Sequence, residues 1–105
     1  MLNEYSVGDS RDLLKKVDSQ SVDLIYIDPP YCTGRDFYHF DDRFKSSADY
    51  RELLMRPILT ECHRILSDVG NIVVHVEPKV SHHIRILLDD IFGEKRFKNE
   101  IVWVS

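Results

Sequence analysis

Residues 21–31 of the chain read SVDLIYIDPPY. The six residues from Val22 to Ile27 are almost all apolar, which is typical of a strand that is covered on both faces of a parallel sheet. Asp28 and two prolines end this strand, because proline has no N–H group to donate to a sheet ladder. The segment therefore predicts a buried strand that presents a carboxylate at its carboxyl end.

Strand and helix patterns alternate on both sides of this segment. Apolar residues recur at three- and four-residue spacing from residue 48 onward, and we expect Pro57 to kink this helix and Gly70 to end it. The expected strands span residues 5–7, 22–27, 71–76 and 101–104, and the expected helices span residues 12–17, 48–69 and 80–92. This order predicts an α/β fold with a mostly parallel sheet and flanking helices.

Composition limits the class of protein. The chain has 105 residues, 43% of them hydrophobic, which suits one domain with a modest core. Its 4 glycines and 4 prolines are scattered, which excludes collagen-like and low-complexity chains.

No apolar run approaches the roughly 20 residues of a membrane span, and the first residues lack a signal-peptide pattern. Two cysteines make no disulfide framework, so we expect a cytoplasmic protein. The net charge of −4 argues against nucleic-acid binding by bulk attraction alone.

The carboxyl end of the strand at 22–27 is the strongest candidate site, because ligands of open α/β sheets bind at such ends. Pro29 and Pro30 fix the backbone and remove two N–H donors. What remains is the Asp28 carboxylate, outward-facing carbonyls and the aromatic ring of Tyr31. These groups form a pocket rich in hydrogen-bond acceptors with a stacking surface, although the same residues in isolation would also suit a turn that ends a strand.

Residues 25–34, IYIDPPYCTG, resemble the catalytic motif of the DNA methyltransferases that modify the amino group of adenine (N6) or cytosine (N4). Residues 8–14 and 21–25 resemble the segment before that motif, and residues 64–74 and 91–103 resemble the segments after it. With the catalytic motif first, the order resembles the permuted β-type arrangement. The resemblance implies a partial Rossmann-like methyltransferase fold, with residues 1–105 as the N-terminal part of the catalytic domain. The cofactor-binding Phe-x-Gly-x-Gly sequence of this family does not occur here.

The resemblance also implies a reaction. S-adenosylmethionine would donate a methyl group to the amino nitrogen of a base flipped out of double-stranded DNA. Asp28, Pro29, Pro30 and Tyr31 would be the catalytic residues: the Asp28 carboxylate and the Pro29 carbonyl accept hydrogen bonds from the amino group, and Tyr31 stacks on the base. Aspartate in first place favours adenine N6, with cytosine N4 as the alternative.

The same resemblance implies cofactor contacts, and the aromatic loop after the motif offers further candidates for binding the base. Asp9 and Asp28 would contact the cofactor, although an aspartate after a glycine equally suits a helix N-cap. Phe37 and Tyr38 would join Tyr31 in binding the base, or would simply pack the long loop onto the domain. The five histidines show no ligand spacing with the cysteines, so we expect no metal site.

Because the Phe-x-Gly-x-Gly sequence is missing, the sequence leaves open whether this chain is active and what it assembles with. We expect the isolated chain to be inactive, and to form a homodimer or to pair with a complementary C-terminal polypeptide. The alternatives are a non-catalytic remnant that serves as a binding or assembly module, or a methyltransferase that acts on protein glutamine or ribosomal RNA guanine.

Overall fold

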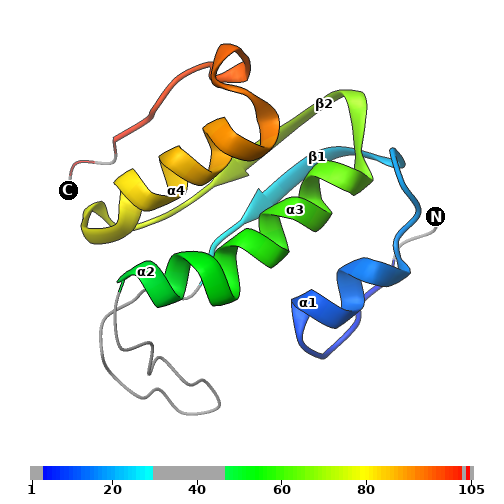
Figure 1. Ribbon diagram of the computed structural model, residues 1–105. Helices are drawn as coiled ribbons and strands as arrows, with labels where there is room; N and C mark the ends of the chain where they lie inside the picture. Colours follow the sequence, from blue (N-terminus) through cyan, green and yellow to red (C-terminus); the bar gives the residue numbers. More distant parts are fainter. Residues whose placement is uncertain (1–3, 30–46, 103, 105) are drawn as a thin grey trace.

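The computed structural model describes residues 4–29, 47–102 and 104. Two parallel strands, β1 (Val22–Ile27) and β2 (Leu66–Val74), lie behind the helices α3 (Arg56–Ile65) and α4 (Pro78–Phe92) in Figure 1. Short elements complete the order: α1 (Ser10–Leu13), the 3-10 turn η1 (Leu14–Lys16), α2 (Ser47–Asp49), the π-helix η2 (Tyr50–Met55) and the 3-10 turn η3 (Glu94–Arg96). The α/β class, the parallel pairing and the flanking helices are confirmed.

The core lies between one face of the sheet and the two long helices. Ile25 is buried on β1, and Ile27, Ile72 and Val74 pack against the core from the same sheet face. The apolar residues of each helix recur every three or four positions, which places them on one side of that helix. The buried helical residues are Ile58, Leu59, Cys62 and Ile65 on α3 and Val80, Ile84 and Leu87 on α4.

The other face of the sheet is open in the described part of the chain. Leu24 and Tyr26 of β1 are 65% and 64% exposed, and Val73, the partner of Tyr26 on β2, is also exposed. The expectation of a strand covered on both faces is therefore wrong for these residues. The continuous apolar sequence still predicts the strand itself. Because successive side chains of a strand point to opposite faces, its apolar residues lie on both the covered and the open face of the sheet.

The helix that begins at α2 differs from the expected one. It ends at Ile65, so Gly70 lies inside β2 instead of ending the helix. Ahead of Pro57 the helix widens into a π-helix, and the Arg56 N–H donates to the Arg51 carbonyl, five residues back. Proline has no backbone N–H group to donate to the carbonyl four residues before it, so a regular helix would lose one hydrogen bond there. The wider turns of the π-helix accommodate this missing bond.

Strand β2 begins five residues earlier than the sequence pattern predicts. Val22 pairs with Leu66 and Leu24 pairs with Asn71, so residues 67–70 face Asp23 alone and form a bulge. The Ser67 hydroxyl donates to the Asp23 carboxylate at 2.7 Å across this bulge. Beyond the bulge, Ile25 pairs with Ile72 and Ile27 pairs with Val74. These four side chains face the core.

The two ends of the chain form less structure than expected. Residues 5–7 form no strand, and neither do residues 98–102 and 104. The first helix, expected over 12–17, is present as α1 and η1, and α4 ends at Phe92 before Gly93 as expected. Within residues 4–29 and 47–102, no helix is long and apolar enough to cross a bilayer.

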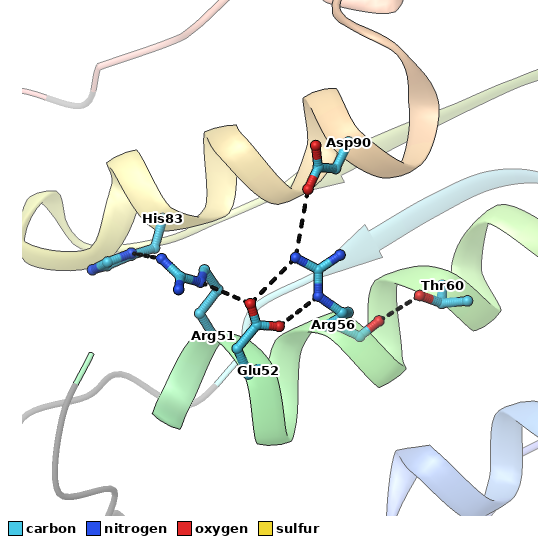
Figure 2. Close-up of polar contacts among 6 residues, drawn as sticks. All are labelled: Arg51, Glu52, Arg56, Thr60, His83 and Asp90. Atoms are coloured by element: carbon cyan, nitrogen blue, oxygen red, sulfur yellow. Dashed lines mark hydrogen bonds and ion pairs between the residues drawn. The ribbon is translucent and has the colours of Figure 1, made fainter. Parts of the chain in front are cut away.

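Polar contacts hold α4 against η2 and the start of α3 (Figure 2). Arg51 Nη1 lies 3.0 Å from His83 Nδ1, and Arg56 Nη2 lies 3.5 Å from the Asp90 carboxylate. Glu52 bridges the two arginines by bonding both. These pairs are only partly shielded from water, so their role is to orient the helices more than to stabilise them strongly.

Candidate active site

A hollow of about 360 Å³ opens where α1, β1 and α3 meet. Its floor is the carboxyl half of β1, ending at Asp28 and Pro29, and its walls include Ser10, Ile58 and Cys62. The lining is largely apolar because α3 turns its buried face toward the strand. The carboxyl end of β1 thus borders a concave surface, as the sequence predicts for a site at this position.

Asp28 and His75 lie side by side at the carboxyl edge of the sheet. His75 donates its backbone N–H to the Ile27 carbonyl at 2.9 Å, which extends the ladder one residue beyond β2. This bond brings the His75 Nδ1 atom to 3.4 Å from the Asp28 Oδ1 atom, with the side chains 54% and 55% exposed. The carboxylate is therefore accessible to a ligand and has an imidazole beside it.

His75 is not among the site residues expected from the sequence. In the structure His75 follows β2 directly, as Asp28 follows β1, whereas the sequence pattern places His75 inside a strand expected over residues 71–76. The equivalence of the two positions depends on the bulge in β2, which the sequence pattern does not reveal.

Asp9 is the N-cap of α1 and accepts from the Arg11 backbone N–H at 2.8 Å. Both of its carboxylate oxygens also bond the Arg11 guanidinium, at 3.1 and 2.7 Å. The Arg11 side-chain hydrogen bonds, followed by the backbone one, lower the pKa of Asp9 to about 2. The capping interpretation is confirmed, and a cofactor would have to compete with Arg11 for this carboxylate.

The remaining predicted site residues, Pro30, Tyr31, Phe37 and Tyr38, lie outside the described residues. Asp28 and Pro29 are therefore the part of the predicted catalytic motif that the structure describes. Pro29 is buried, which anchors the backbone immediately after the carboxylate.

Other reactive side chains in the described ranges do not form a second centre. Burial raises the pKa of the Cys62 thiol to about 11, so the thiolate nucleophile is scarce at neutral pH although Cys62 borders the hollow. Among the residues that the structure describes, no group of three or more His, Cys, Asp or Glu side chains could hold a metal ion.

Comparison with known proteins gives a consistent result. Residues 22–105 match the family model described as DNA methylase, of the N6/N4 methyltransferase class. The chain is 36% identical over 95 residues to the type II methyltransferase M.KpnI of Klebsiella pneumoniae, covering 85% of this chain and 23% of that protein. It is 38% identical over 90 residues to the type II methyltransferase M.EcaI of Enterobacter cloacae, covering 81% of this chain and 20% of that protein.

A third relative is the DNA adenine methyltransferase YhdJ of Escherichia coli, strain K12. It is 31% identical over 96 residues, which cover 91% of this chain and 31% of the relative. The aligned regions thus make up less than a third of each of these three relatives.

Proposed function

Because the chain belongs to the N6/N4 DNA methylase family, we propose that it carries the catalytic motif of an enzyme that methylates the N6 amino group of adenine in DNA. The observation that supports this most is the position of Asp28 and Pro29, at the carboxyl end of β1 and beside a hollow. The adenine preference draws on the aspartate in the motif and on the relative that is named an adenine methyltransferase.

The proposed chemistry uses hydrogen-bond acceptors. The lone pair of an adenine amino nitrogen is delocalised into the ring, which makes the group a weak nucleophile. Asp28 and the Pro29 carbonyl would each accept a hydrogen bond from the amino group and direct its lone pair outward. The Asp28 carboxylate would also stabilise the positive charge that develops on nitrogen during methyl transfer. Tyr31 would stack on the flipped base, with Phe37 and Tyr38 beside it.

S-adenosylmethionine would supply the electrophilic methyl group when bound. The described residues fit it in part: Asp28 offers a half-exposed carboxylate beside an apolar hollow, which suits a sulfonium cation flanked by carbon. Asp9 fits less well because Arg11 bonds both of its oxygens. Residues 1–105 contain no Phe-x-Gly-x-Gly sequence, so we place the rest of the cofactor site outside these residues.

The test is methyl transfer from radiolabelled S-adenosylmethionine to duplex DNA, with the chain alone and together with a candidate C-terminal polypeptide. We expect activity only in the combination, and N6-methyladenine as the product in mass spectrometry. Asp28→Ala should abolish it, whereas Asp18→Ala, the same change before the other end of β1, should not. N4-methylcytosine would replace the adenine proposal, and no methylation in any combination would favour a binding or assembly module.

A further inference from the structure

We propose that Arg64 is a positioning residue that holds residues 10–16, the α1–η1 segment, in place as one wall of the hollow beside Asp28. This inference rests on the proposed function, in which the hollow is part of the cofactor site. It adds to that site a residue of α3 that lies outside the motif at 28–31 and does not itself line the hollow.

The α1–η1 segment cannot hold its position by itself. It consists of a four-residue helix and a three-residue 3-10 turn, and helices this short are unstable in isolation. None of its residues is fully buried, and Leu14 is only partly buried against the core. Ser10 and Leu14 nevertheless line the hollow. The shape of the hollow therefore depends on the contacts that fasten this segment to the rest of the fold.

Arg64, the second-last residue of α3, supplies such a contact through its guanidinium group. Its Nη2 atom donates to the Leu14 carbonyl at 2.9 Å, and its Nη1 atom donates to the Ser19 hydroxyl at 3.0 Å. Its Nε atom donates to the Glu61 carboxylate, also at 2.9 Å. The planar guanidinium is thus fixed by three acceptors. A lysine ammonium on its flexible chain cannot reproduce this arrangement.

The bond to Leu14 connects Arg64 directly to the wall of the hollow. The Leu14 carbonyl also accepts the Val17 N–H at 3.1 Å, which closes η1, so both acceptor positions of this oxygen are used. The Arg64 backbone carbonyl accepts the Gln20 N–H at 2.9 Å. The chain from Leu14 to Gln20 is therefore fastened to the end of α3, two residues after Cys62, which also lines the hollow.

Arg11 makes a second contact at the other end of the segment, and this contact is weaker. Its Nη1 atom lies 3.4 Å from the Leu53 carbonyl, and its side chain is 44% exposed. The Arg64 side chain is 32% exposed, and its bond to Leu14 is shorter and partly buried. Water competes less with the shielded bond, so Arg64 is the main support of the wall.

The first experiment detects the contact in the chain itself. In hydrogen–deuterium exchange, Arg64→Lys and Arg64→Ala should speed the exchange of the Leu13 and Val17 amides by about 10-fold, because these amides bond within the segment. The amides of α4 should keep their wild-type rates, which shows that the rest of the chain stays folded. Arg64→Lys decides the result if the alanine variant does not fold.

Two control variants separate this contact from the other bonds of the arginines. Ser19→Ala removes one bond of the guanidinium and keeps the bond to Leu14. Arg85→Ala removes an exposed arginine from α4, where it pairs with Asp89. Both controls should leave the exchange of the segment unchanged. Wild-type rates at Leu13 and Val17 in the Arg64 variants would overturn the inference.

The second experiment asks whether the wall matters to the cofactor. In the combination that methylates DNA, Arg64→Lys should raise KM for S-adenosylmethionine by about 10-fold with little change in kcat. Ser19→Ala should leave both constants at their wild-type values. A merely structural role would reduce the amount of active enzyme, which lowers the apparent kcat and leaves KM unchanged.

A wild-type KM in Arg64→Lys and Arg64→Ala, or a loss of kcat alone, would overturn the inference even if the enzyme is active. If no combination methylates DNA, the proposed function fails. The exchange rates then still decide whether Arg64 holds the α1–η1 segment in place.

Discussion

The Nη1 atom of Arg11 lies 3.4 Å from the carbonyl oxygen of Leu53. Leu53 stands four residues before Pro57, so in a regular helix its carbonyl would face the one backbone nitrogen that carries no hydrogen. The same guanidinium bonds the carboxylate of Asp9, the cap of α1. Arg11 therefore connects the first helix to the widened helix that leads into α3.

The cap and its ion pair make stability depend on pH. We expect Asp9→Ala to lower the free energy of unfolding by about 1 kcal/mol at pH 7. The pKa of Asp9 falls to about 2 in the folded chain, against about 3.9 in an unfolded one. Since the folded pKa is the lower one, the ionic part of this stability is complete above pH 4 and is lost as the pH falls toward 2. Urea unfolding from pH 2 to 7 measures it.

The matched control for Asp9 is Asp18→Ala, an exposed aspartate in the loop before β1. It should change the unfolding free energy by less than about 0.5 kcal/mol at every pH. An Asp9→Ala variant that loses the same free energy at pH 2 as at pH 7 would contradict the assignment.

Gly70→Ala should destabilise the bulge of β2. A Cβ atom at this position would lie 2.6 and 2.8 Å from two side-chain carbons of Leu66 and 3.1 Å from the Asp23 carbonyl oxygen. The strand must shift to admit it, at a cost of about 1–3 kcal/mol in unfolding free energy. Asn71→Ala, at the next and exposed position, is the control. Equal denaturation midpoints for the two variants would show that the bulge is not tightly packed.

Acid should weaken the contact between α4 and η2. Burial, then His82 and Arg51, lower the pKa of His83 below its usual value of about 6.5. Below that pH the unfolded chain binds more protons than the folded one, so stability falls as the pH drops from 7 to 5. We expect His83 to contribute less than about 1 kcal/mol to the change in unfolding free energy between pH 7 and pH 5. His83→Asn keeps an acceptor for Arg51 (Figure 2) and should remove this contribution. Thermal unfolding at both pH values tests it, and an unaltered slope would count against it.

The Cys62 thiol should be inert in the folded chain. It is fully buried and its pKa is raised to about 11, so its thiolate is about 100-fold rarer than that of an ordinary thiol at pH 8. In a Cys32→Ser background, a chromogenic disulfide should label Cys62 slowly in buffer and rapidly in urea. Rapid labelling of the native chain would mean that α3 opens readily.

The open face of the sheet should drive association. Full burial of an exposed apolar side chain such as Leu24 or Tyr26 stabilises an assembly by about 1.5–3 kcal/mol. Covering both side chains would therefore stabilise a dimer or a complex. We expect self-association of the chain in sedimentation at micromolar concentration, and its loss in the double variant Leu24→Lys, Tyr26→Lys. Ile86→Lys, on the exposed side of α4, is the control. A stable wild-type monomer at high concentration would contradict this expectation.

Elements with local signals could be predicted from the amino-acid sequence alone. The bounds of β1 follow from an apolar run that ends at Asp28-Pro29, and α4 follows from its apolar spacing between Pro78 and Gly93. The candidate site also followed from the sequence, because a carboxylate directly after a parallel strand must lie at the ligand-binding edge of a sheet.

Tertiary contacts set the start of β2, the π-helix and the proximity of Asp28 to His75. Residues 66–70 continue the helical spacing of α3, yet they enter the strand because Leu66 finds a partner in Val22. Local patterns record which side chains are apolar, whereas strand register and bulges depend on contacts between segments more than 40 residues apart. For that reason the sequence located Asp28, and the fold was needed to find the histidine beside it.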